Sequence, residues 1–161
     1  MDVVLVEIDD ANIDAVLSVR LAPGQERFVT TVQQSLDEAV AWSRANPWYR
    51  AVYVGGEPVG FLMLSWNVEP QPPDIIGPWF LWKLIIDASH QGRGYGAQVV
   101  GLVAGIVRNE GGSELLTSYV EGPGGPAGFY ARLGFEPTGE VDPEGEIIMR
   151  LPLTAEVPST S

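Results

Sequence analysis

The segment QGRGYG, residues 91–96, holds residue types that could bind an anion. Its glycines let a bulky group approach the backbone closely, and Gln91 and Arg93 add side-chain donors. The segment lies between two apolar runs and is predicted to join a buried strand to a long helix. Unpaired N–H groups and the helix dipole favour a phosphate at such a helix N-terminus. A glycine turn without any ligand is the alternative interpretation.

Two known phosphate-binding patterns do not fit these glycines. A dinucleotide fingerprint counted from Gly94 would need a glycine at Val99, and a Walker loop would need Gly-Lys followed by Ser or Thr. What remains is the pattern Gln/Arg-x-x-Gly-x-Gly/Ala, which Gln91, Gly94 and Gly96 match.

The elements around this segment alternate between strand and helix patterns. The continuous apolar run at 79–86 predicts a central strand buried on both faces, and the glycine pair at 55–56 predicts a tight hairpin turn. We expect strands at 3–8, 48–54, 59–66, 79–86, 115–120, from 135 and at 145–153, and helices from about 10, at 35–45, at 94–109 and up to 133. This order predicts an α/β fold with a mixed sheet, in one domain over residues 1–153, followed by a disordered tail at 154–161.

Composition limits the function further. The chain has 161 residues, 45% of them hydrophobic, and no cysteine, which excludes disulfides, thiolate metal sites and cysteine nucleophiles. No apolar stretch reaches the ~20 residues of a membrane span and no signal peptide is recognisable, so we expect a cytoplasmic protein without a membrane partner. The formal net charge of −12 would repel nucleic acid and attract a cationic small molecule. Solubility is the alternative explanation of that acidity.

Two segments resemble the GNAT superfamily of acyl-CoA-dependent N-acetyltransferases. LIIDASHQGRGYGAQVV (84–100) is similar to their pyrophosphate loop after the fourth strand. GFYARLGFEPTGE (128–140) is similar to their terminal Phe-Tyr-x-x-Leu-Gly-Phe signature, and the predicted order of elements agrees over residues 1–153. The resemblance implies a mostly antiparallel central sheet of about six to seven strands with flanking helices.

The same resemblance implies acetyl-CoA as co-substrate and no metal. An amine would attack the thioester directly, while main-chain N–H groups of the fourth strand polarise the carbonyl. Tyr130 would protonate the departing thiolate, because a phenol stays protonated at neutral pH. Packing of Tyr130 in the core beside Phe129 and Phe135 is the alternative. The residues expected to bind acetyl-CoA are Leu84, Ile85, Ile86, Gln91, Gly92, Arg93, Gly94, Tyr95, Gly96 and Ala97.

A carboxylate is expected to take the proton of the amine. Glu26 is the first candidate, directly or through water. Four rival carboxylates could equally be solvated loop charges: Glu57, Glu69, Asp74 and Glu121. His90, the single histidine, is expected at the surface. Pro123 stands where the family usually has an asparagine, which puts the affinity for CoA in question.

A looser resemblance concerns the acceptor. LAPGQERFVTTVQQSLDEA (21–39) is similar to the region between the first two helices of bacterial diamine and polyamine N-acetyltransferases. We therefore expect a small cationic amine as substrate, a polyamine or diamine first. An amine-bearing antibiotic or other xenobiotic is the alternative acceptor, and a non-catalytic acyl-CoA-binding regulator is the alternative class of protein.

Three tryptophans are candidates for lining the groove that would bind the acceptor amine. Trp66, Trp79 and Trp82 would either line it, where aromatic faces favour cationic amines, or fill the core, and for Trp79 and Trp82 we expect the core. Exposed edge strands would suit a homodimer.

Overall fold

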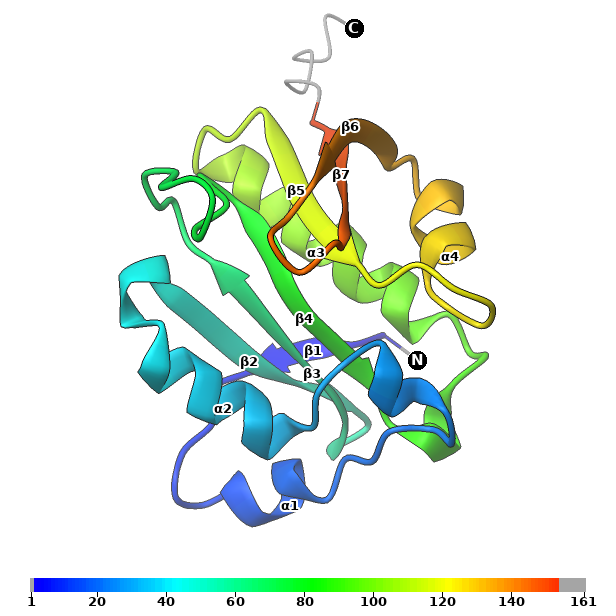
Figure 1. The fold of residues 1–161 in the computed structure, drawn as a ribbon. Coiled ribbons are helices and arrows are strands. Elements are labelled where there is room, and N and C mark those ends of the chain that lie inside the picture. The colour runs from blue at the N-terminus through cyan, green and yellow to red at the C-terminus, as the bar shows by residue number, and fades with distance from the viewer. Residues whose placement is uncertain (1, 154–161) are drawn as a thin grey trace, which may run out of the picture.

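The computed structural model describes residues 2–153, in which one sheet runs through the molecule with helices on both of its faces (Figure 1). The order of the seven described strands is β1-β2-β3-β4-β5-β7-β6. The strands are β1 (Val4–Val6), β2 (Pro47–Val54), β3 (Glu57–Ser65), β4 (Phe80–Ile86), β5 (Glu114–Tyr119), β6 (Glu136–Val141) and β7 (Ile147–Pro152). The helices are α1 (Ile13–Leu17), α2 (Val32–Ala41), α3 (Tyr95–Asn109) and α4 (Ala127–Arg132), with single 3₁₀ turns at Gln25–Arg27, Ser43–Ala45 and Ala88–His90.

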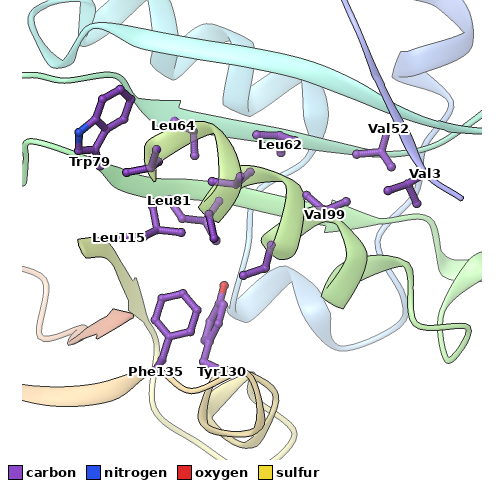
Figure 2. Close-up of a cluster of buried hydrophobic side chains, with 14 of the residues drawn as sticks. Val3, Val52, Leu62, Leu64, Trp79, Leu81, Val99, Leu115, Tyr130 and Phe135 are labelled. Atoms are coloured by element: carbon purple, nitrogen blue, oxygen red, sulfur yellow. The ribbon is translucent and has the colours of Figure 1, made fainter. Parts of the chain in front are cut away.

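Alternate side chains of β3 enter two different cores. Leu62 and Leu64 pack in a cluster with residues of α3 and α4, which Figure 2 shows, whereas Phe61 and Met63 pack with residues of α1 and α2. All four side chains are fully buried. Because successive side chains of a strand point to opposite faces, β3 is covered on both sides and reads as a continuous apolar run.

The sheet opens between β4 and β5. These two strands run parallel and pair only at Phe80–Leu116 and Leu81–Thr117, whereas the other neighbouring strands pair antiparallel. The Thr117 hydroxyl donates to the Leu81 carbonyl at 3.0 Å, at this last pair. Beyond it β4 continues to Ile86 beside β3 alone, so the two strands diverge and leave the edge of β4 without a strand partner.

The predicted α/β class with a mostly antiparallel sheet is confirmed, and the bounds of the first strand and of the first two helices were wrong: α1 begins at Ile13, and α2 ends at Ala41 rather than 45. The first strand is shorter than 3–8, because the Asp9 carboxylate accepts the N–H groups of Ala11 and Asn12 and turns the chain toward α1. The second helix begins at Val32 rather than 35, since Thr31 and Gln34 form a capping box.

The structure does not test the predictions on domain organisation, dimerisation and the C-terminal tail. One domain over 1–153 and a homodimer through the edge strands β1 and β6 stay predictions. The tail predicted at 154–161 lies outside the described residues.

Gly60 permits the close pairing of β3 with β4. A Cβ atom at this position would collide with the backbone carbonyl oxygen of Ile85. Gly60→Ala is therefore expected to lower the free energy of unfolding by about 1–3 kcal/mol. The matched control Gly101→Ala, on an exposed position of α3 with open space around it, should raise it by about 0.5–1 kcal/mol. Urea unfolding followed by circular dichroism measures both, and equal stability of the two variants would contradict the expectation.

Candidate active site

A cavity of about 580 Å³ lies at the end of β4. We call it the glycine-loop cavity, because its wall combines the end of β4 with the turn that leads into α3 and with α4. Its lining residues from β4, the turn and α3 are Leu84, Ile85, Ile86, His90, Gln91, Gly92, Gly94, Tyr95, Gly96 and Ala97. The other lining residues are Gln25, Phe28, Val29, Gly124, Pro126, Phe129, Arg132 and Leu133. Nine of the ten residues predicted to bind acetyl-CoA therefore share one cavity, Arg93 being the exception.

The glycines of this turn have two different structural roles. Gly94 is the N-cap of α3 in the left-handed conformation, with φ of +80°, which favours glycine. Gly96 lies within the first turn, where an added Cβ atom would come 3.1 Å from the Phe129 ring. Helix α3 therefore starts with no side-chain cap and with α4 packed closely against it. Its first N–H groups have no partner within the helix, so this end can accept an anion.

Two tethers join the turn to the segment before α2. The Gln91 side chain donates to Gln25 Oε1 at 2.9 Å and to the Ile86 carbonyl at 3.0 Å. The Asp87 carboxylate, which is 6% exposed, accepts the Arg20 N–H at 2.8 Å, and the Ala88 N–H donates back to the Arg20 carbonyl at 2.8 Å. Residues 20–25 and 87–91 thus form one connected unit.

Hydrogen bonds keep Asp87 ionised despite its burial. Burial opposes the charge, but donors from Ser89, the Arg20 N–H and His90 outweigh it and hold the pKa of Asp87 well below its usual range. His90 Nδ1 lies 3.0 Å from Asp87 Oδ2, so the histidine is part of this network and not only a surface residue. Arg93 is exposed beside the same turn, with its guanidinium 3.4 Å from the Ser89 carbonyl.

A second cavity, of about 430 Å³, adjoins the first. We call it the acidic cavity. The two share Phe28, Val29, Leu84 and Pro126 in their walls. The acidic cavity carries six carboxylate side chains, against the cations Arg27 and Lys83: Glu26, Glu38, Asp74, Asp142, Glu144 and Glu146. Trp42 and Trp82 add aromatic surface to its wall.

Two of these carboxylates are held by named partners. Glu38 on α2 pairs with Lys83 on β4 at 3.1 Å and accepts the Thr30 hydroxyl at 3.1 Å. Glu146 accepts the Ser118 hydroxyl at 3.2 Å. Burial and the neighbouring Asp142 raise the pKa of Glu146. Among residues 2–153, no group of three or more His, Cys, Asp or Glu side chains is arranged to hold a metal ion.

Tyr130 is packed in the core beside the opening of the sheet. Its ring lies between Phe129 and Phe135, with ring centroids 5.3 and 5.2 Å away. Figure 2 shows its hydroxyl directed away from α4. Burial raises the pKa of Tyr130, while a hydrogen bond with Thr117 acts in the opposite direction. The phenol thus remains protonated and stands near the last residue pair of β4 and β5, although Tyr130 is not on the wall of either cavity.

Comparison with known proteins decides the family. Residues 18–135 match the model of the Acetyltransferase (GNAT) family. The chain belongs to this family. The predicted resemblance is therefore confirmed, and the GNAT chain is an acetyltransferase.

Relatives and solved structures agree with this assignment. The GNAT chain is 25% identical over 150 residues to the spermine/spermidine N(1)-acetyltransferase of Bacillus subtilis (strain 168), and the match covers 92% of this chain and 97% of that one. An acetyltransferase from Thermus thermophilus superposes with a TM-score of 0.70 at 21% identity, over 95% of this chain and 98% of that one. The PaiA N-acetyltransferase of Thermoplasma acidophilum in complex with coenzyme A gives 0.63 at 14% identity, over 94% and 99%.

Only some of the remaining predicted residues line one of the two cavities. Glu26 is exposed and lines the acidic cavity, as does Asp74. The other rival carboxylates line neither cavity: Glu57, Glu69 and Glu121. Trp79 is buried in the core as expected, and Trp66 packs against it with ring centroids 4.9 Å apart. The expectation for Trp82 was incomplete, since it packs partly in the core and also lines the acidic cavity.

Sequence patterns missed Glu146, the Lys83–Glu38 pair and the tethers of Asp87. No local motif marks them, because each joins segments far apart in the chain. The charge of Lys83 inside an apolar strand was the one available signal. No helix among residues 2–153 is long and apolar enough to cross a membrane.

Proposed function

We propose that the protein transfers the acetyl group of acetyl-CoA to a primary amine of a small cationic acceptor, with polyamines and diamines as the first candidates. The observation that carries this proposal is the junction of the two cavities, which share Phe28, Val29 and Leu84. One cavity has a glycine turn and a helix N-terminus, which suit a diphosphate, and the other has an excess of carboxylates, which suits a cation.

The donor would lie along the end of β4. The N-terminus of α3 supplies N–H groups and a positive dipole end for the diphosphate, and Arg93 stands beside it as an exposed counter-charge. The edge of β4 over Leu84–Ile86 has no strand partner, so main-chain N–H groups there are free to polarise the thioester carbonyl. Backbone groups of Gly124 and Pro126 line the cavity close to Pro123, where the asparagine is missing.

The reaction needs no acyl-enzyme. The amine attacks the thioester carbon, the C–N bond forms, the C–S bond breaks, and the thiolate takes a proton from the Tyr130 hydroxyl. A phenol kept protonated by burial suits this role. Thr117 and Tyr130 stand near the point where β4 and β5 part, and Leu84 of β4, which lines both cavities, lies three residues beyond the last pair.

The acceptor would lie in the acidic cavity. The exposed Glu26 and Asp74, in the loop before β4, add negative charge, and Trp42 and Trp82 add aromatic surface, which favours a cation. The names of the Bacillus relatives, which act on spermine and spermidine, favour the same class of acceptor.

An amine panel with salt variation tests the proposal. Thiol release from acetyl-CoA is measured with spermidine, a diamine, an amine-bearing antibiotic and a neutral amine. We expect kcat/KM to be highest for spermidine or the diamine and to fall as ionic strength rises, because salt screens the attraction of the carboxylates. A preferred neutral acceptor would contradict the cationic assignment. Acetyl-CoA binding without thiol release for any amine would favour the non-catalytic alternative.

Arg93→Gln tests the diphosphate site. Loss of a charge-assisted hydrogen bond is expected to weaken acetyl-CoA binding by about tenfold in calorimetry. Arg108→Gln is the control, because it removes the same charge from the opposite end of α3. Equal affinities of the two variants would remove Arg93 from the donor site.

Tyr130→Phe tests the general acid, since it keeps the ring and its packing. The single-turnover rate should fall by about 10²–10⁴-fold with acetyl-CoA affinity unchanged. Tyr53→Phe, which removes a hydroxyl outside both cavities, should retain the rate. Full single-turnover activity of Tyr130→Phe would make its role structural.

A further inference from the structure

The turn between β6 and β7 brings Glu146 to the opening of the sheet. The Asp142 N–H donates to the Glu146 carbonyl at 3.0 Å, and the Glu146 N–H donates to Asp142 Oδ1 at 2.9 Å. These two bonds fix the backbone of the turn. Figure 1 shows this turn, in orange, beside the end of β5 and in front of β4.

The side chain of Glu146 is anchored at the inner end of the acidic cavity. Its Oε1 accepts the Ser118 hydroxyl at 3.2 Å, and Ser118 follows Thr117, the last residue of β5 that pairs with β4. Lys83 and Leu84 of β4 line the same cavity, and Leu84 also lines the glycine-loop cavity. The carboxylate therefore faces the region where donor and acceptor would meet.

The other carboxylates of the cavity are placed less favourably. Glu26, Asp74 and Glu144 are exposed, and Glu38 is engaged by Lys83. Asp142 accepts N–H groups of its own turn. Glu146 is half-buried, and the one described hydrogen-bond partner of its carboxylate is the Ser118 hydroxyl.

We propose that Glu146, rather than Glu26, accepts the proton of the attacking amine. This inference rests on the proposed function. The acceptor ammonium gives one proton to the Glu146 carboxylate and becomes a neutral amine. After the C–N bond forms and the C–S bond breaks, the thiolate takes its proton from Tyr130, and the amide nitrogen loses its second proton to solvent. Solvent then reprotonates Tyr130 and deprotonates Glu146, so that one proton is released for each acetyl group transferred.

Electrostatics support this role. Burial raises the pKa of Glu146, as do the charges of Asp142 and Glu144, whereas the Ser118 hydroxyl and Lys83 lower it. A raised pKa makes a carboxylate a stronger base. The charge of Glu146 in turn raises the pKa of Tyr130, so the two groups lie within electrostatic reach of each other. Glu26 and Arg27 are the charged groups that line this cavity from the segment before α2.

Glu146→Gln is the direct test. The single-turnover rate with spermidine at neutral pH should fall by about 10²-fold, with unchanged acetyl-CoA affinity and thermal unfolding. Glu140→Gln makes the same charge change on the exposed strand β6, outside both cavities, and should retain the rate. Glu146→Asp keeps a carboxylate with a shorter reach and should recover part of the loss.

The pH dependence separates proton transfer from a structural or binding role. In the wild type the rate should fall at acid pH as the carboxylate takes a proton. Ser118→Ala removes a hydrogen bond that lowers the pKa of Glu146, so the acid limb should move to higher pH. Asp142→Asn removes a negative charge that raises this pKa, so the limb should move to lower pH. Glu26→Gln should raise KM for the amine and leave the position of the limb unchanged.

The outcomes separate this inference from the proposed function. Wild-type protein that acetylates no amine overturns the proposed function and the inference together. Active wild type with a Glu146→Gln variant of full single-turnover rate overturns the inference alone. So does an acid limb that neither Ser118→Ala nor Asp142→Asn moves, because the carboxylate would then serve binding and not proton transfer.

Discussion

The parting of β4 and β5 after two residue pairs is the constraint on which the candidate site depends. The two parallel strands pair only at Phe80–Leu116 and Leu81–Thr117, and beyond these residues each follows its antiparallel neighbour. Backbone groups on the open edge of β4 lose strand partners, which a folded protein tolerates where water or a ligand can replace them. Leu84 of β4 lines both cavities beside this opening, so one irregularity in the sheet would provide space for the proposed donor and acceptor at once.

The charged side chains around the opening differ in their exposure to solvent. Exposed carboxylates such as Glu26 and Asp74 line the acidic cavity at the surface, where solvent screens them. Deeper in, Lys83 neutralises Glu38, and Glu146 stands half-buried beside Ser118. The aromatic cluster around Tyr130 packs in the core beside the opening and holds a neutral phenol. A cationic acceptor would thus be attracted over a distance by the exposed carboxylates and would meet the half-buried Glu146 near the opening.

Local patterns were sufficient for most of the fold and for one half of the site. The apolar runs of β3 and β4 and the glycines before α3 are contiguous in the chain, and for this reason nine predicted donor residues fall in one cavity. The acidic cavity could not be predicted in this way. Its wall joins α2, β4, β5 and the β6–β7 turn, and only the pairing of β5 with β7 brings Glu146 to Ser118. Glu26 was predicted as the base because it lies in a segment that resembles the family. In the structure Glu26 is exposed, whereas Glu146 is half-buried.

The tethers between residues 20–25 and 87–91 would make the binding of the two proposed substrates interdependent. Arg20 and Gln25 precede the segment that carries Phe28 and Val29, which face both cavities, while Asp87 and Gln91 belong to the turn that would hold the donor. A ligand that immobilises the turn also immobilises the segment, and the entropy cost of that ordering is incurred once. If bound donor raises the affinity for the acceptor by some factor, bound acceptor raises the affinity for the donor by the same factor, because coupling between binding sites is reciprocal.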